Sequence, residues 1–253
     1  MAGFDLFRIT ELVKRTPAPS QEGGFLANGP WFLPDGSLVA SLDLWAAAWI
    51  WAGYGFNIQA GLATTPITFA GAYDADAPDL FVHIPNGYAF IPLEIEVTFE
   101  AVGTESTMEI MALASPEGDS SATVTGGALA TVANMRVGSS ITSGVTASGG
   151  VDAAGITDPN VTGSFTFWRA QRPLTDTVAT TENDRHDLNF RWNHRQNGAP
   201  PVILGSPAGT LGSAAAGGSL SVYAASQAGT GFIIVNAIIL PPTLAQVMFG
   251  NAP

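Results

Sequence analysis

The feature that most constrains the fold of this chain is a strict alternation of apolar and polar side chains over residues 91–99. Every second position there is isoleucine, leucine, valine or phenylalanine, and the positions between hold proline, glutamate or threonine. Successive side chains of a β-strand point to opposite faces of the sheet, so this period of two predicts a strand with one buried and one solvated face. Residues 187–193 show the same alternation.

Further strand patterns follow at intervals and are separated by glycine and proline turns. They cover residues 64–69, 107–113, 165–168, 220–224 and 232–240, and thinner strands are expected within the light segment 120–160. No long helical pattern alternates with them, which excludes a parallel α/β sheet. The sequence therefore predicts an all-β fold: an antiparallel two-sheet sandwich, of either jelly-roll or immunoglobulin-like type. The cysteine and tryptophan pairing of immunoglobulin domains is missing, which favours the jelly roll.

The first 57 residues are predicted to stand apart from this sandwich. Residues 5–16 carry apolar side chains, Phe7 and Leu12 among them, at helical spacing, and a proline-rich stretch stops the pattern. Residues 21–34 are rich in glycine and proline and predict an extended linker. We expect residues 1–57 to form an N-terminal arm with a short helix and a tryptophan-rich anchoring segment, residues 58–242 the sandwich, and residues 243–253 a C-terminal tail.

The anchoring segment contains the most apolar run of the chain, residues 44–56. It carries no charge but is only 13 residues long, against roughly 20 for a helix that spans a bilayer. We therefore predict no membrane span, and expect Trp45, Trp49 and Trp51 to contact another protein subunit. Residues 43–51 fit either a short helix or a buried strand.

The charge and composition of the chain limit the kinds of partner that it can bind. Apolar residues make up 46% of the chain and charged residues only 12%, and the net charge is −12 with a single lysine, Lys14. Direct nucleic-acid binding needs clustered basic residues, so we do not expect it. There is no cysteine, which excludes disulfides and thiolate chemistry. A surface of threonine, serine, asparagine and alanine suits contact with other subunits.

The sequence carries no motif of a nucleophile, a phosphate loop or a metal site, so we predict neither enzyme activity nor a cofactor. Glu94, Glu96 and Glu100 share one strand face, and a glycosidase pair among them stays open on spacing alone. Alternating loop carboxylates at Asp74, Asp76 and Asp79 are an acidic turn, with a calcium site as the alternative. We predict no metal site.

Residues 185–195 mix arginine, histidine, asparagine and aromatic side chains, a composition typical of interfaces. Arg191 and Trp192 are the predicted contact anchors there. The alternative is a lectin-like or fibre-like module in which a sugar stacks on an exposed Trp168 or Trp192.

Three features together give the chain a resemblance to known proteins: the arm, the cysteine-free and lysine-poor sandwich, and the closing strand GTGFIIVNAIILPP. They resemble jelly-roll virion proteins, especially bacteriophage capsid or capsid-decoration proteins, over residues 58–242. The resemblance implies a homo-oligomer, a trimer by expectation, that contacts other capsid proteins through its arm. It also implies a chain made in the host cytoplasm and located in the virion, at an outer or cementing position since a basic arm is missing.

Overall fold

The computed structural model describes residues 42–62, 64–102, 106–116, 124, 128–151, 155–160, 162–174, 189–194, 202–205, 217–224 and 228–249. The chain divides into two compact units, residues 1–49 and 50–253, and the strands that the structure describes lie in the second. The expected arm, with Phe7 and Leu12, lies outside the described residues.

Helix α2, Leu42–Trp51, resolves the alternative left open for the tryptophan-rich run in favour of a helix. Alanine and leucine, both strong helix formers, supply half of its ten residues. Ala46 and Trp49 are buried, whereas Trp51 at the end of the helix is exposed.

The first sheet contains six antiparallel strands. Its order is β10-β4-β12-β1-β7, and β2 pairs with β12 beyond the end of β1. The strands are β1 Gly55–Ala60, β2 Ile67–Ala70, β4 Ala89–Val102, β7 Thr131–Asn134, β10 Asn189–Asn193 and β12 Ala228–Leu240. The boundary expected after residue 57 thus falls inside β1, because the sheet begins at Gly55.

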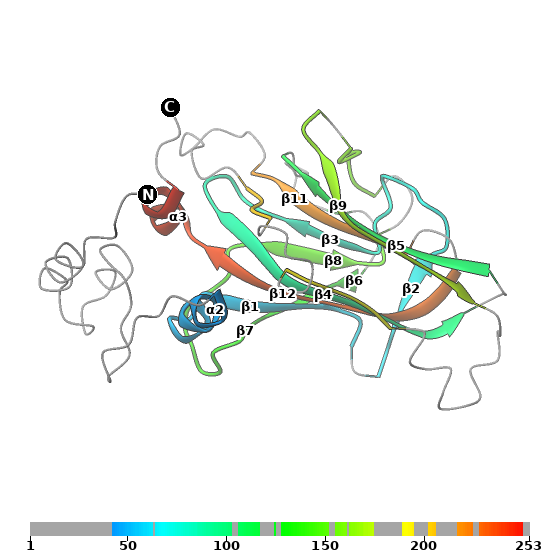
Figure 1. Cartoon of the computed structure of the whole chain (residues 1–253), viewed down its shortest axis with the longest axis horizontal. Coiled ribbons are helices and arrows are strands. Elements are labelled where there is room, and N and C mark those ends of the chain that lie inside the picture. The colour runs from blue at the N-terminus through cyan, green and yellow to red at the C-terminus, as the bar shows by residue number, and fades with distance from the viewer. Residues whose placement is uncertain are drawn as a thin grey trace, which may run out of the picture. The chain divides into compact units, whose positions relative to one another are not determined.

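The second sheet also contains six antiparallel strands, in the order β6-β8-β3-β11-β5-β9 (Figure 1). The strands are β3 Leu80–His83, β5 Ser106–Ser115, β6 Ala128–Leu129, β8 Thr146–Gly149, β9 Phe165–Leu174 and β11 Ser219–Ala224. One buried cluster combines Ile95 and Val235 of the first sheet with Ile110 and Val222 of the second. The two sheets therefore enclose a common core, and the predicted all-β sandwich is confirmed.

Within the two sheets, the paired strands are nested along the chain, so that the pair furthest apart in sequence encloses the others in turn. β1 pairs with β12, β3 with β11, β4 with β10, and β5 with β9. These four pairs alternate between the sheets, first, second, first and second. The short strands β6, β7 and β8 lie between β5 and β9 in sequence and extend both sheets at β1 and β3.

The strands at 64–69, 91–99, 107–113, 165–168, 187–193, 220–224 and 232–240 are confirmed, with ends that differ by up to several residues. Two strands, β1 and β3, were not predicted. Within 120–160, β6, β7 and β8 confirm thin strands, but Val137, expected in one of them, lies in a turn and is 97% exposed.

The expected C-terminal tail contains helix α3, Pro242–Phe249, so the tail prediction is wrong for those residues. Proline is favoured in the first helical turn because its missing N–H would have no helical partner there. The carbonyl of Pro241 accepts hydrogen bonds from the N–H groups of Leu244 and Ala245, which closes the first turn. A proline pair that ends a strand thus also starts a helix.

Gly231 holds the tightest approach between β12 and its neighbours. A Cβ atom there would lie 2.1 Å from the carbonyl oxygen of Thr98 and 2.8 Å from a ring carbon of Phe69. We expect Gly231→Ala to lower the free energy of unfolding by about 2–3 kcal/mol, because β4 or β2 must shift. Gly138→Ala is the matched control, since no heavy atom lies within 4 Å and only its positive φ of 84° adds cost. Urea denaturation measures both, and an equal loss in the two variants would contradict this reading.

Candidate functional site

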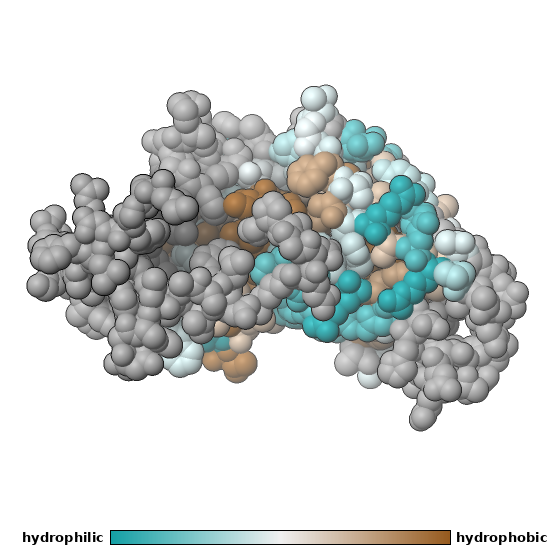
Figure 2. Space-filling model, viewed as in Figure 1, coloured by the Kyte–Doolittle hydropathy of each residue, from teal (hydrophilic) through white to brown (hydrophobic). Residues whose placement is uncertain are grey.

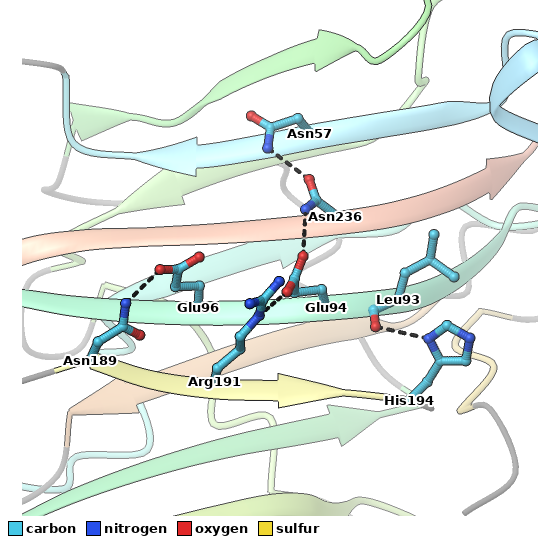
Figure 3. Close-up of polar contacts among 8 residues, drawn as sticks. All are labelled: Asn57, Leu93, Glu94, Glu96, Asn189, Arg191, His194 and Asn236. Atoms are coloured by element: carbon cyan, nitrogen blue, oxygen red, sulfur yellow. Dashed lines mark hydrogen bonds and ion pairs between the residues drawn. The ribbon is translucent and has the colours of Figure 1, made fainter. Parts of the chain in front are cut away.

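A ladder of polar side chains crosses the outer face of the first sheet (Figure 3). Asn57 Nδ2 donates to Asn236 Oδ1 at 2.8 Å, and Asn236 Nδ2 donates to Glu94 Oε2 at 3.1 Å. Arg191 Nε donates to the other oxygen of Glu94 and forms an ion pair with it. The ladder thus joins four adjacent strands, β1, β12, β4 and β10, through side chains that alternate with core residues.

Glu96, the second carboxylate of this face, also accepts a hydrogen bond from an asparagine side chain. Asn189 Nδ2 donates to Glu96 Oε1 at 2.6 Å, across the β10–β4 pair (Figure 3). The hydrogen bond and charge of Glu94 raise the pKa of Arg191, which keeps its positive charge at the exposed edge. Glu94 and Glu96 thus each hold a partner on this face, and neither lines the pocket described below.

The predicted stacking tryptophans are not available to a sugar. Trp168 is only 8% exposed and Trp192 only 5%, and both belong to the sandwich core. The Trp192 ring meets Phe167 edge-on, with ring centroids 5.2 Å apart. The predictions of a glycan site on Trp168 or Trp192, and of Trp192 as a contact anchor, are therefore wrong for this structure.

The remaining predicted contact residues fall into different environments. Trp49 is buried, the side chain of Trp45 lies outside the described residues, and Trp51 is 76% exposed. Arg191 is exposed on β10. Trp51 and Arg191 thus remain available to a partner.

The side chain of His194 is held by a contact with the backbone. Both the ring Nδ1 and the backbone N–H of His194 lie within hydrogen-bond distance of the carbonyl of Leu93, at 2.9 and 3.2 Å (Figure 3). Since a carbonyl only accepts, the Nδ1 atom carries the proton in this contact. Across the described ranges, no three histidine or acidic side chains gather closely enough to hold a metal ion.

A pocket of about 560 Å³ lies beside β2, between the loop that follows this strand and the end of β8. Its lining is mostly small side chains and strand backbone, with two carboxyl groups. The lining residues are Pro66, Ile67, Thr68, Phe69, Ala70, Ala72, Asp74, Ala77, Asp79, Gly149, Gly150 and Val151.

Asp79 is the buried acid of this pocket and connects the two sheets. Its Oδ1 accepts the N–H of Ala70 at 2.9 Å, at the end of β2, and its Oδ2 accepts the N–H of Ala224 at 2.6 Å, at the end of β11. Burial raises the pKa of Asp79 to about 7 against the opposing effect of the two backbone hydrogen bonds. Because each of its oxygens accepts a backbone hydrogen bond from a different sheet, the Asp79 carboxyl links the two sheets and has a structural role.

In the sequence, Asp79 is predicted only as one carboxylate of the acidic turn. The signal that could have found it is its position directly before the apolar run Leu80-Phe81-Val82, because an acid adjoining a fully buried strand is drawn into the interior. Asn57 and Asn236 were also missed, since their contact joins residues 179 positions apart.

Figure 2 shows hydrophilic side chains gathered over the region where Figure 1 places β4, β5 and β9. In the part of the chain that the structure describes, no helix is long and apolar enough to cross a membrane.

Comparison with protein-family models, curated proteins and solved structures found no match for this chain.

Proposed function

We propose that this chain is a structural subunit of a virion, a capsid or capsid-decoration protein that assembles with copies of itself and contacts other capsid proteins. The observation that carries the proposal is the nested pairing of β1·β12, β3·β11, β4·β10 and β5·β9 across two sheets. This order supports a jelly-roll topology, in which one long folded hairpin is wound into two Greek keys. Jelly rolls occur in capsid, lectin and cupin proteins, so the fold needs further support from the surface.

The outer face of the first sheet supplies part of that support. Its carboxylates and amides bond to one another, as Glu94 does to Asn236 and Arg191, so few of its polar groups depend on water. Side chains that are already held in place lose little conformational freedom when a second protein covers them. Such a face suits permanent contact within a shell.

Charge fits the same role. The chain has 21 acidic and 9 basic residues, and this excess of one sign keeps an apolar protein soluble at high copy number before assembly. We assign the chain to the virion exterior. We propose that it forms a trimer in which residues 1–34 of one subunit bind a neighbouring subunit.

The test is the solution mass of the purified full chain, measured by light scattering across protein concentration and salt. We expect a closed oligomer, a trimer or a larger assembly, whose mass does not change over the concentration range. A monomer at every concentration would contradict the proposal.

Deletion of residues 1–30 separates the arm from the sandwich. We expect the truncated chain to retain its β-sheet circular dichroism and to lose higher assembly, because every strand in the described part of the chain begins at or after Gly55. Unchanged assembly of the truncated chain would show that the arm is not a clamp.

A further inference from the structure

An exposed tryptophan and an exposed valine flank an arginine at one end of the first sheet. Trp51 is 76% exposed and Val137 is 97% exposed. Arg136 precedes Val137 in sequence and contacts Trp51: its Nη1 donates to the carbonyl of Trp51 at 3.1 Å, and its guanidinium lies 6.0 Å from the centre of the Trp51 ring. We call Trp51, Arg136 and Val137 the Trp51 patch.

Hydrogen bonds fix the two backbone turns that carry the Trp51 patch. Asn134 Nδ2 donates to the carbonyls of Gly53 and Ile141, at 2.7 and 3.1 Å, which fixes the turn after α2 to the turn after β7. The N–H of Ser139 donates to the carbonyl of Arg136 at 3.0 Å and closes the second turn. Tryptophan and arginine on a rigid support are the residues that most often dominate binding energy at protein interfaces.

A second surface, at the loop after β2, has the opposite charge. Tyr73 is 45% exposed and its ring packs on Tyr223, with centroids 5.1 Å apart. The Tyr223 hydroxyl donates to the carbonyl of Ala75, and the N–H of Ile156 donates to the carbonyl of Asp76, which ties this loop to the 155–160 segment. Burial, and then the negative charges of Asp158, Asp74 and Asp76, raise the pKa of Tyr73. We call Tyr73, Asp74, Asp76 and Asp158 the Tyr73 surface.

The two surfaces cannot meet within one subunit. Gly55, next to the Trp51 patch, pairs with Ile238 of β12, and Ala70, next to the Tyr73 surface, pairs with Ala228. These positions on β12 are ten residues apart, which is about 33 Å along a strand. Figure 1 places β7 and β2 toward opposite ends of this sheet, in agreement. A contact between the surfaces must therefore join two molecules.

We propose that the Trp51 patch of one copy of this chain docks on the Tyr73 surface of a second copy, with Arg136 facing the carboxylates of Asp76 and Asp158. The inference rests on the proposed function, since it names the contact through which the subunits assemble. Local charge complementarity selects the occupant: the Trp51 patch offers a cation beside exposed apolar side chains, and the Tyr73 surface offers carboxylates beside an exposed ring. A contact between two different surfaces repeats head to tail, and it closes into a ring such as a trimer when the rotation between copies allows.

Charge reversal with rescue tests the pairing. We expect Trp51→Ala and Arg136→Glu each to weaken association by at least ~30-fold in sedimentation, the scale of a hot-spot loss. Asp76→Arg should weaken it likewise, and Arg136→Glu combined with Asp76→Arg should recover part of the loss. Phe165→Ala, which removes an exposed aromatic ring from β9, is the matched control and should leave association unchanged.

Crosslinking gives a second measurement on the same contact. The chain has no cysteine, so Val137→Cys with Asp76→Cys introduces the only two thiols. Mild oxidation should produce a ladder of covalent multimers from the double variant, because each thiol pairs with the other thiol of a neighbour. Each single variant should remain uncrosslinked.

The outcomes distinguish the two proposals. A wild-type chain that is monomeric throughout contradicts the proposed function itself. A wild-type oligomer that survives Trp51→Ala and Arg136→Glu, and whose double cysteine variant gives no ladder, contradicts only the head-to-tail contact. Dimers formed by Val137→Cys alone would overturn the inference in favour of a contact between two identical patches.

Discussion

Replacing Trp192 with alanine should lower the free energy of unfolding by about 3–5 kcal/mol, the usual cost of truncating a buried tryptophan. Trp192 is enclosed within the sandwich core, on the face of β10 opposite Arg191. Its ring contacts Phe167 of β9 in the second sheet edge-on, an arrangement that adds to the gain from burial. The substitution therefore leaves a cavity between the edges of both sheets.

Trp51→Ala is the matched control for this measurement. Its ring is largely exposed, so at a protein concentration low enough for all chains to be monomeric the free energy of unfolding should change by less than about 0.5 kcal/mol. Urea denaturation followed by circular dichroism compares the two variants at one protein concentration. A loss of similar size in both would mean that the core does not depend on Trp192 as its burial indicates.

The second large effect is a fall in stability as the pH rises from about 4 to about 7. The pKa of Asp79 is about 7 in the folded protein, raised from 3.8 by burial. Below pH 4 the carboxyl is protonated in both folded and unfolded states. Between pH 4 and 7 the folded protein retains a proton that the unfolded chain has released, so the free energy of unfolding decreases with pH. A difference of about three pKa units corresponds to about 4 kcal/mol, fully lost above pH 7.

Asp79→Asn removes the titrating group and should flatten this part of the stability profile. It retains one acceptor oxygen for Ala70 or Ala224 but presents an amide donor to the other N–H, so its stability at pH 5 should be below that of the wild type. Asp158→Asn, at an exposed carboxylate, should leave the fall intact. Denaturation midpoints at pH 5 and pH 8 decide: an equal decrease in wild type and Asp79→Asn would show that Asp79 is not the group responsible.

Much of the sandwich was predictable because its long strands bury one face only. In β4, Ile95 and Val97 enter the core while Glu94 and Glu96 point outward, and that contrast is visible as a period of two. β1 was missed because it follows a tryptophan-rich helix without a change in hydrophobicity, so only the turn at Gly53 marks the boundary. The length of β3, four residues, is too short to show a period at all.

The sites were less predictable because they depend on pairing between distant strands. Trp168 has large apolar neighbours on the other face of its strand, so its burial is not visible locally, whereas Trp192 shares the apolar face of β10 with Phe190, a pattern that already indicated burial. Asn57 meets Asn236 only because β1 lies beside β12. Arg136 approaches Trp51 across 85 positions through the turn after β7, a contact that no local spacing indicates.

The nested strand order also governs when the protein can fold during its synthesis. β12 lies between β4 and β1 in the first sheet, and of the described strands it is the last to be synthesised. Until it emerges, β1 and β4 have no common neighbour to pair with, and their apolar faces remain open to solvent or to other nascent chains. The second sheet is complete one strand earlier, once β11 is out. The first sheet can thus be completed only after β12 is made and inserts between strands that were synthesised long before it.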